Sequence, residues 1–175
     1  ETLFRAALCL LYAHWEGFVK AAARSYLEFV SLRRLPYREL QSNFLALGIR
    51  QHLRRSGESR SVAVHKRFVD AMLEMLDDPS NRNLQDAIDA RGNLNYNALS
   101  DILVAVGVDE TPYATKKAVI DEKLLSRRNS VAHGDFLPID ADEYSNLHAQ
   151  VLDLIDRLRT DLENAAVMRS YLRHA

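Results

Sequence analysis

The chain has 175 residues, of which 47% are hydrophobic and 27% are charged, and these values fit a single globular domain with a substantial core. Its one cysteine, Cys9, excludes an internal disulfide, and no apolar stretch approaches the roughly 18–20 residues of a membrane span. We therefore expect a cytoplasmic protein without a membrane partner. Because the chain begins at Glu1 and not at methionine, we also expect residues to be missing before it.

The net charge of −1 is unevenly distributed along the chain. Residues 1–76 hold 12 Lys and Arg against 7 Asp and Glu, a net charge of +5, whereas residues 77–175 hold 11 against 17, a net charge of −6. The arginines of the basic half form two clusters, at 33–38 and 50–60. Solvated helix faces explain such clusters, and a polyanionic partner is compatible with them.

Apolar residues in the first half recur at steps of three and four, the spacing of one face of a helix. They predict a long helix over residues 2–31, which Pro36 ends because proline disfavours helix in the residue before it. A shorter helix is expected over 37–47, with Gly48 as its cap, followed by one or two helical turns over 49–55 and a polar break at 55–61. The apolar residues between 62 and 76 predict another helix, which ends in the segment 77–83.

The second half continues this helical pattern. We expect a short helical piece over 83–90, a short helix around 99–106 that Gly107 closes, and one helix over 112–133 with Gly134 in left-handed backbone just past its end. Asp140 and Glu143 have the spacing of a capping box at the start of a last helix that runs almost to the C-terminus. No region alternates with period two. The sequence thus predicts an all-α domain over 1–175, a bundle of four to five main helices with short extra helices.

The stretch RRNSVAHG, residues 127–134, places unusual polar chemistry at the end of an otherwise apolar helix. Asn129 and His133 are four residues apart and share a helix face. Arg128 and His133 are five apart, about 140° around the axis, so they can share a site only because the helix ends here. Arginine suits phosphate and histidine suits general acid–base work. Considered alone, an arginine, an asparagine and a histidine near a helix end are usually capping and surface residues.

The segment RNSVAHG resembles the motif of the HEPN family, which comprises all-α ribonucleases and nucleotide-binding domains. The family's arginine, four residues and histidine map onto Arg128, Asn129 and His133. The segments LYAHWEGFVK (11–20) and YLEF (26–29) are similar to the opening helix of a HEPN branch found in toxin–antitoxin and phage-defence loci. The resemblance spans most of the chain, with residues 48–110 least constrained, and it implies an up-and-down HEPN bundle.

The resemblance also implies an activity, that of a metal-independent endoribonuclease without cofactor. In this chemistry the 2′-hydroxyl of RNA attacks the adjacent phosphate and leaves a 2′,3′-cyclic end, which selects RNA over DNA. His133 would be the general base or acid, Arg128 would bind the phosphate, and Asn129 would orient His133 or hold a phosphate oxygen. Because one histidine cannot easily serve both steps, the resemblance implies a homodimer with both motifs in one cleft. It further implies a role as a toxin or antiviral effector, with an antitoxin protein as a possible partner.

Some assignments stay open at this stage. Arg127 is a second phosphate contact or a surface ion pair. Glu16 either reaches the cleft or orients a motif residue, or it is an ordinary helix-surface residue. The alternative functions are a non-catalytic helical module that dimerises and binds RNA, a nucleotide or a partner protein, and a purely structural dimerisation domain. The remaining histidines have no metal-ligand spacing and are expected to be structural: His14, His52, His65, His148 and His174.

Overall fold

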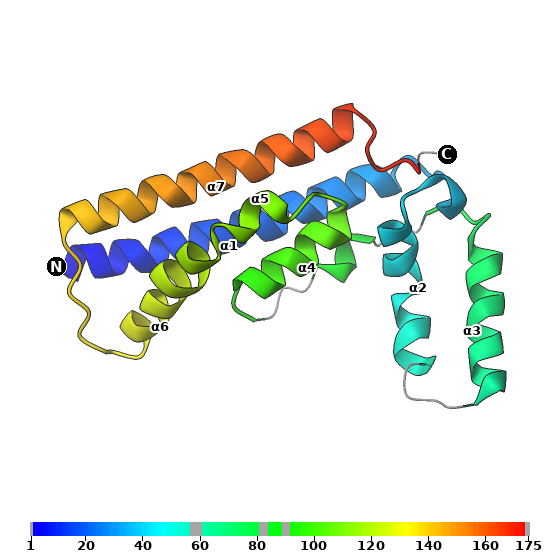
Figure 1. Ribbon diagram of the computed structural model, residues 1–175, viewed down its shortest axis with the longest axis horizontal. Coiled ribbons are helices and arrows are strands. Elements are labelled where there is room, and N and C mark those ends of the chain that lie inside the picture. The colour runs from blue at the N-terminus through cyan, green and yellow to red at the C-terminus, as the bar shows by residue number, and fades with distance from the viewer. Residues whose placement is uncertain (1, 57–60, 81–83, 89–91, 174–175) are drawn as a thin grey trace.

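The computed structural model describes residues 2–56, 61–80, 84–88 and 92–173, and the side chains of all of these except 51–56. Within these ranges the chain forms helices and no strand, which confirms the all-α prediction (Figure 1). None of the described helices has the length and apolar character needed to cross a membrane. In chain order the elements are α1 (Thr2–Ser31), the 3-10 turn η1 (Tyr37–Glu39), α2 (Ser42–Ser56), α3 (Val62–Met75), the 3-10 turn η2 (Leu84–Ala87), α4 (Tyr96–Val106), α5 (Thr111–Ala114), the π-helical segment η3 (Val119–Ser126), α6 (Arg127–Ala132) and α7 (Ala141–Val167).

The two longest helices, α1 and α7, lie side by side and run in the same direction (Figure 1). Near the starts of both helices, the ring centroids of Phe4 and Tyr144 lie 5.6 Å apart. Near the end of α1, the ring centroid of Phe29 lies 6.1 Å from that of Tyr171, in the segment that follows α7. The run from α5 through α6 returns in the opposite direction beside α1. The loop after α6 therefore brings the chain back to the start of α1, where α7 begins.

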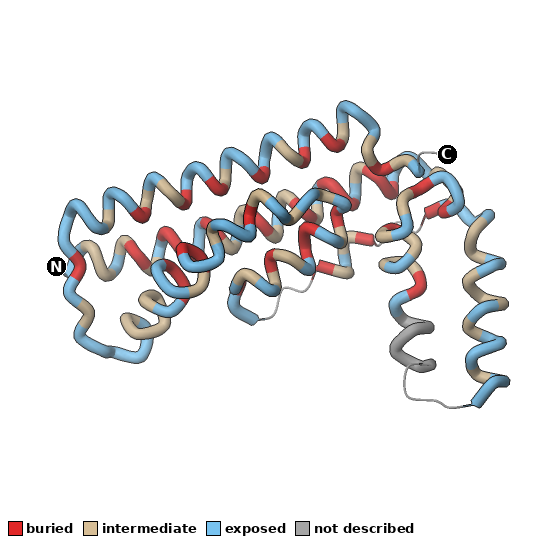
Figure 2. The backbone as a smooth tube through the Cα atoms, in the orientation of Figure 1, coloured by how far each residue is buried: buried red, intermediate tan, exposed pale blue. Residues whose placement is uncertain are grey.

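The hydrophobic core lies where α1, α4, η3 and α7 face one another (Figure 2). Trp15 of α1, Leu103 of α4 and Ile120 of η3 are fully buried, and Leu154 of α7 is buried almost as completely. Burying one such large apolar side chain stabilises a fold by roughly 1.5–3 kcal/mol. This shared core fixes the helical run that carries residues 127–134 against α1 and α7.

The pair α2 and α3 projects from one end of the molecule (Figure 1). The prediction of a helix over 37–47 capped by Gly48 is wrong, because η1 is a single 3-10 turn and α2 runs through Gly48 to Ser56. Glycine fits inside this helix because Tyr37 packs onto it: a Cβ at Gly48 would lie 2.5 Å from the Tyr37 hydroxyl oxygen. The prediction for 62–76 is confirmed by α3. Of the short piece expected over 83–90, the 3-10 turn η2 forms, and residues 83, 89 and 90 lie outside the described part.

The single helix predicted over 112–133 is also wrong in part. Helix α5 ends at Ala114, and a turn at Thr115 and Lys116 separates it from the next helical residues. The chain turns where Tyr113 is fully buried and donates its hydroxyl proton to Asp161 Oδ2 of α7 at 2.7 Å. Residues 119–126 then adopt π-helical geometry, and α6 begins only at Arg127.

The predicted helix ends are largely confirmed. Gly107 (φ 73°) and Gly134 (φ 88°) both have left-handed backbone, and Asp140 Oδ1 accepts the Glu143 main-chain N–H at 2.8 Å. The second half of the capping box does not form, because the Glu143 carboxylate instead pairs with Arg127. The N-terminus of α7 is thus capped by Asp140 and tied to α6 by Glu143.

The left-handed backbone at Gly134 makes a testable prediction. Gly134→Ala should lower the free energy of unfolding by about 1–2 kcal/mol, because a Cβ in this conformation meets the following carbonyl oxygen. Gly17→Ala is the matched control: it lies inside α1 with open space around a new Cβ, and it should raise stability by about 0.5–1 kcal/mol. Urea unfolding curves of both variants measure the difference. Equal shifts in the same direction would contradict the assigned backbone.

Candidate active site

The side chain of Arg128 points toward α1 because it lies on the same side of the helical run as buried residues one turn earlier. Leu124 and Leu125 of η3 are buried, and Arg128 lies three to four residues beyond them on the same side of the helical run. π-helical segments are rare and occur frequently at functional sites, and this one ends immediately before α6. The local fold therefore turns a charged side chain inward at the end of an apolar helical face.

The Arg128 guanidinium lies between an aromatic ring and an amide. Its central carbon is 3.9 Å from the centroid of the Tyr12 ring, and its Nη2 donates to Asn93 Oδ1 at 2.7 Å. Its Nε is buried and has no hydrogen-bond partner. A cation over an aromatic ring gains about 0.5–1 kcal/mol when exposed and about 2 when desolvated. Arg128 is thus held by α1 and by the segment before α4.

Tyr12 is itself fixed by main-chain and side-chain contacts. Its hydroxyl oxygen accepts the Leu94 main-chain N–H at 2.7 Å. Burial raises the pKa of Tyr12, and hydrogen bonding with Glu16 raises that pKa further, so the phenol stays protonated at neutral pH. The Glu16 carboxylate also pairs with Lys20 one turn further along α1. Glu16 therefore does not contact Arg128 directly but hydrogen-bonds with Tyr12, on whose ring the Arg128 guanidinium lies.

His133 is the C-cap residue directly after α6, and it is exposed. Its main-chain N–H donates to Asn129 O at 2.9 Å, and two further bonds close the helix end: Gly134 N–H to Val131 O at 3.1 Å and Asp135 N–H to Ser130 O at 2.9 Å. This pair of bonds is the Schellman arrangement for a helix that ends in left-handed glycine. The imidazole is thus presented to solvent on a well-fixed backbone.

Within one chain, the structure does not bring the arginine and the histidine of the motif into contact. Among the contacts of the described residues, none links the His133 imidazole to Arg128, and the side chain of the half-buried Asn129 makes no hydrogen bond. Arg128 faces α1, whereas His133 faces solvent. The guanidinium and the imidazole are therefore two separate groups on one helix end.

Arg127 ties α6 to α7. Its Nη1 pairs with Glu143 Oε1, and its Nη2 donates to Pro138 O at 3.3 Å. Its side chain is only 19% exposed. Of the two alternatives left open by the sequence, the geometry matches the ion pair.

Comparison with known proteins adds one finding. Residues 1–164 match the sequence profile of the family described as RiboL-PSP-HEPN. The chain belongs to this family. No curated protein and no solved structure has significant similarity to it. The match confirms that the chain holds a HEPN domain.

Sequence reasoning missed two residues of the site in this HEPN domain, Tyr12 and Asn93. Tyr12 shares a helix face with Glu16 and Lys20, so its spacing was visible, but nothing in the sequence connected that face to Arg128. Asn93 lies in the segment RGNLNYN, whose position relative to the motif depends on the tertiary fold.

Of the other histidines of the HEPN domain, those whose side chains are described lie apart from the motif. His14 is exposed on α1, His65 lies on α3, and the ring of His148 lies 5.9 Å from that of Tyr144. The side chain of His52 and the whole of His174 lie outside the described residues. Across the described part of the chain, no three His, Cys, Asp or Glu side chains gather closely enough to hold a metal ion.

The stacking of Arg128 on Tyr12 predicts a measurable coupling. In a double-mutant cycle, Tyr12→Leu and Arg128→Ala together should cost about 0.5–2 kcal/mol less than the sum of the single changes, because either change alone removes the cation–ring contact. Tyr12→Phe, which keeps the ring and removes the hydroxyl, should retain most of this coupling. Denaturant unfolding supplies all the values. Strictly additive losses would rule the contact out.

The Arg127–Glu143 pair predicts a pH dependence of stability. The Arg127 guanidinium holds the pKa of Glu143 below its ordinary 4.5, so the pair stabilises the fold above that pH and the stabilisation is lost as the pH falls below it. Because Glu143 is half exposed, Glu143→Gln should cost no more than about 1 kcal/mol at pH 7.

The cost of Glu143→Gln should vanish in acid, and unfolding curves at neutral and low pH measure it. Asp142→Asn is the matched control, since Asp142 shares the first turn of α7 and its favourable dipole but does not contact Arg127. A cost that persists undiminished in acid would show that the ion pair is not its source.

Proposed function

We propose that this HEPN domain is a metal-independent endoribonuclease whose active site is completed in a homodimer. The observation that carries the proposal is the pairing, on one helix end, of a half-buried arginine fixed by Tyr12 and Asn93 with an exposed histidine five residues on. Membership of the family supports the HEPN fold. A guanidinium suits the phosphate and an imidazole suits proton transfer.

The proposed reaction uses the RNA itself as the nucleophile. His133 of one protomer accepts the 2′-hydroxyl proton as the 2′-oxygen forms a bond to the adjacent phosphorus. The bond from phosphorus to the 5′-oxygen breaks, and the partner subunit's His133 supplies the proton to that leaving oxygen. The products are a 2′,3′-cyclic phosphate and a 5′-hydroxyl. Arg128 stabilises the extra negative charge of the transition state.

We propose a dimer because a single His133 cannot easily serve as both general base and general acid. Exposed His133 lies at the helix end, and Arg128 faces α1, so a second copy placed across a two-fold axis would supply the missing second imidazole. Asn129, half-buried one turn before His133, would orient that imidazole or hold a phosphate oxygen. Glu16 would act on Arg128 through Tyr12. Such an enzyme would serve as a toxin or phage-defence effector, with an antitoxin protein as its regulator.

One observation favours a second candidate, a non-catalytic HEPN module that dimerises and binds RNA, a nucleotide or a partner protein. The Arg128 guanidinium is already engaged by Tyr12 and Asn93, and it does not contact His133. In such a module, Arg128 would stabilise the fold and would not bind a scissile phosphate. The two candidates differ in whether RNA is cut.

The decisive experiment is cleavage of an unstructured RNA oligomer in EDTA by the purified chain. His133→Ala should reduce the rate by about 10²–10⁴-fold, because a general acid or base contributes this much. His65→Ala on α3 is the matched control and should cleave like the wild type. In a re-equilibrated equal mixture of wild type and His133→Ala, the activity should approach about one quarter of the wild type, since only wild-type pairs hold both imidazoles.

Three outcomes would contradict the proposal. Cleavage that survives His133→Ala would place the chemistry elsewhere. RNA that is bound with a steep salt dependence but never cut would favour the non-catalytic module. Half of the wild-type activity in the mixture would indicate that each chain works alone.

A further inference from the structure

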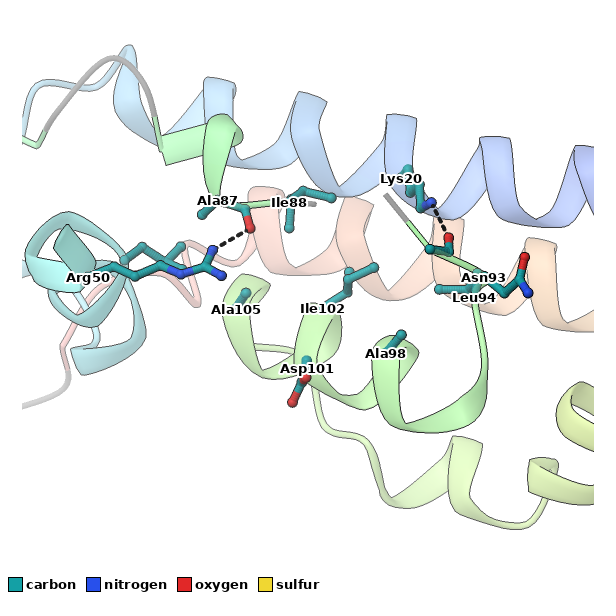
Figure 3. A pocket seen from close by; sticks show the side chains of 12 residues that line it. Lys20, Arg50, Ala87, Ile88, Asn93, Leu94, Ala98, Asp101, Ile102 and Ala105 are labelled. Atoms are coloured by element: carbon teal, nitrogen blue, oxygen red, sulfur yellow. Dashed lines mark hydrogen bonds between the residues drawn. The ribbon is translucent and has the colours of Figure 1, made fainter. Parts of the chain in front are cut away.

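A cavity of about 460 Å³ opens between α1, α2, η2 and α4 (Figure 3). Its volume lies within the range of about 300–1,000 Å³ that is typical of small-molecule sites. In the described part of the chain, the lining residues come from these elements and from the segments around Ile88 and Asn93. None of them belongs to the 127–134 motif.

The cavity is adjacent to the residues that hold Arg128. Asn93 lines the cavity, and its Oδ1 accepts the hydrogen bond from Arg128 Nη2. Leu94, the next lining residue, donates its main-chain N–H to Tyr12, the residue on which Arg128 stacks. One peptide segment therefore forms both the edge of the cavity and the support of the motif arginine.

One wall of the cavity is apolar and built of small side chains. Ala98, Ile102 and Ala105 of α4 are spaced at i, i+4 and i+7, so they form one face of that helix. Ile88 and Leu94, both buried, continue the apolar lining on the other side. The two alanines leave room beside the wall, and a flat ring can pack against such a surface.

Cationic side chains border the cavity and donate to main-chain oxygens. Lys20 Nζ donates to Gly92 O at 3.2 Å, and Arg50 Nη1 donates to Ala87 O at 2.9 Å (Figure 3). Nearby, Arg24 Nη2 donates to Ile88 O at 3.1 Å. Lys20 is also paired with the Glu16 carboxylate, whereas the acceptor of Arg50 is a neutral carbonyl, and a phosphate would offer Arg50 a stronger, charge-assisted bond. The carboxylate among the lining residues, Asp101, belongs to an exposed residue of α4.

We propose that this cavity binds one unpaired nucleotide of the RNA strand next to the scissile phosphate. The base packs against the α4 wall formed by Ala98, Ile102 and Ala105, and its phosphate is bound by Arg50. The inference rests on the proposed ribonuclease function, because it places the scissile phosphate at Arg128. A base inside the cavity cannot be paired, so the cavity selects single-stranded segments.

The test uses one variant that fills the cavity and one that reverses its charge. Ala98→Phe occupies the space beside the wall, and its control Val104→Phe adds the same ring on α4 at a side chain that is 57% exposed. Arg50→Glu reverses a charge at the cavity, and its control Arg67→Glu reverses an exposed charge on α3. Because Arg50 is exposed, its variant remains informative if Ala98→Phe does not fold.

Binding is measured with a fluorescent, unstructured RNA 12-mer in the His133→Ala background, and cleavage positions are mapped without that change. Ala98→Phe and Arg50→Glu should each weaken binding about tenfold or more, since a stacked base and a phosphate contact are lost. They should also change which phosphodiesters are cut. Both controls should bind and cut like their parents.

The outcomes separate this inference from the proposed function. If the wild type cleaves RNA and the cavity variants bind and cut like their controls, the cavity inference is overturned and the ribonuclease stands. If RNA is bound but never cut and the cavity variants still weaken binding, the ribonuclease fails and the cavity remains an RNA site. A wild type that binds no RNA overturns both.

Discussion

The candidate site depends on one contact, the packing of the Arg128 guanidinium on the ring of Tyr12. Partial burial of a guanidinium costs hydration free energy, and here the contacts with the Tyr12 ring and the Asn93 side-chain oxygen offset that cost. The contact joins three segments that are far apart in the chain: the middle of α1, the segment before α4, and α6. The position of α6 relative to the core therefore follows from a polar contact as well as from buried leucines.

Around this contact, charged side chains act mainly on the backbone. Arg127 fixes α6 to the start of α7, and Arg5 of α1 donates to Asp135 O just past the helix end at 2.8 Å. Lys20, Arg24 and Arg50 likewise bind the main-chain oxygens of Gly92, Ile88 and Ala87, and the bond to Gly92 helps to position Asn93, the next residue. The exposed imidazole of His133 thus lies at a helix end whose backbone is fixed by contacts with both α1 and α7.

Local physics made much of the fold predictable. Helix α1, helix α3, the left-handed glycines and the Asp140 cap follow from spacing, from proline and glycine geometry and from a side chain that reaches its own helix end. The wrong predictions concern helix boundaries that depend on a contact with a residue distant in the sequence. Gly48 signals a helix end by itself, but Tyr37 packs on it and the helix continues. The turn after α5 likewise depends on the burial of Tyr113 against α7.

The sequence by itself determined the all-α class, the helix end at Gly134 and the polar motif that precedes it, because these depend on residues within a few positions of one another. The tertiary structure alone decided the direction and partner of each motif side chain. It turned Arg128 onto Tyr12 and Asn93, paired Arg127 with Glu143 and left His133 in solvent. These contacts join residues far apart in the chain, and only the packing of α1, α4, α6 and α7 around a common core brings them within bonding distance.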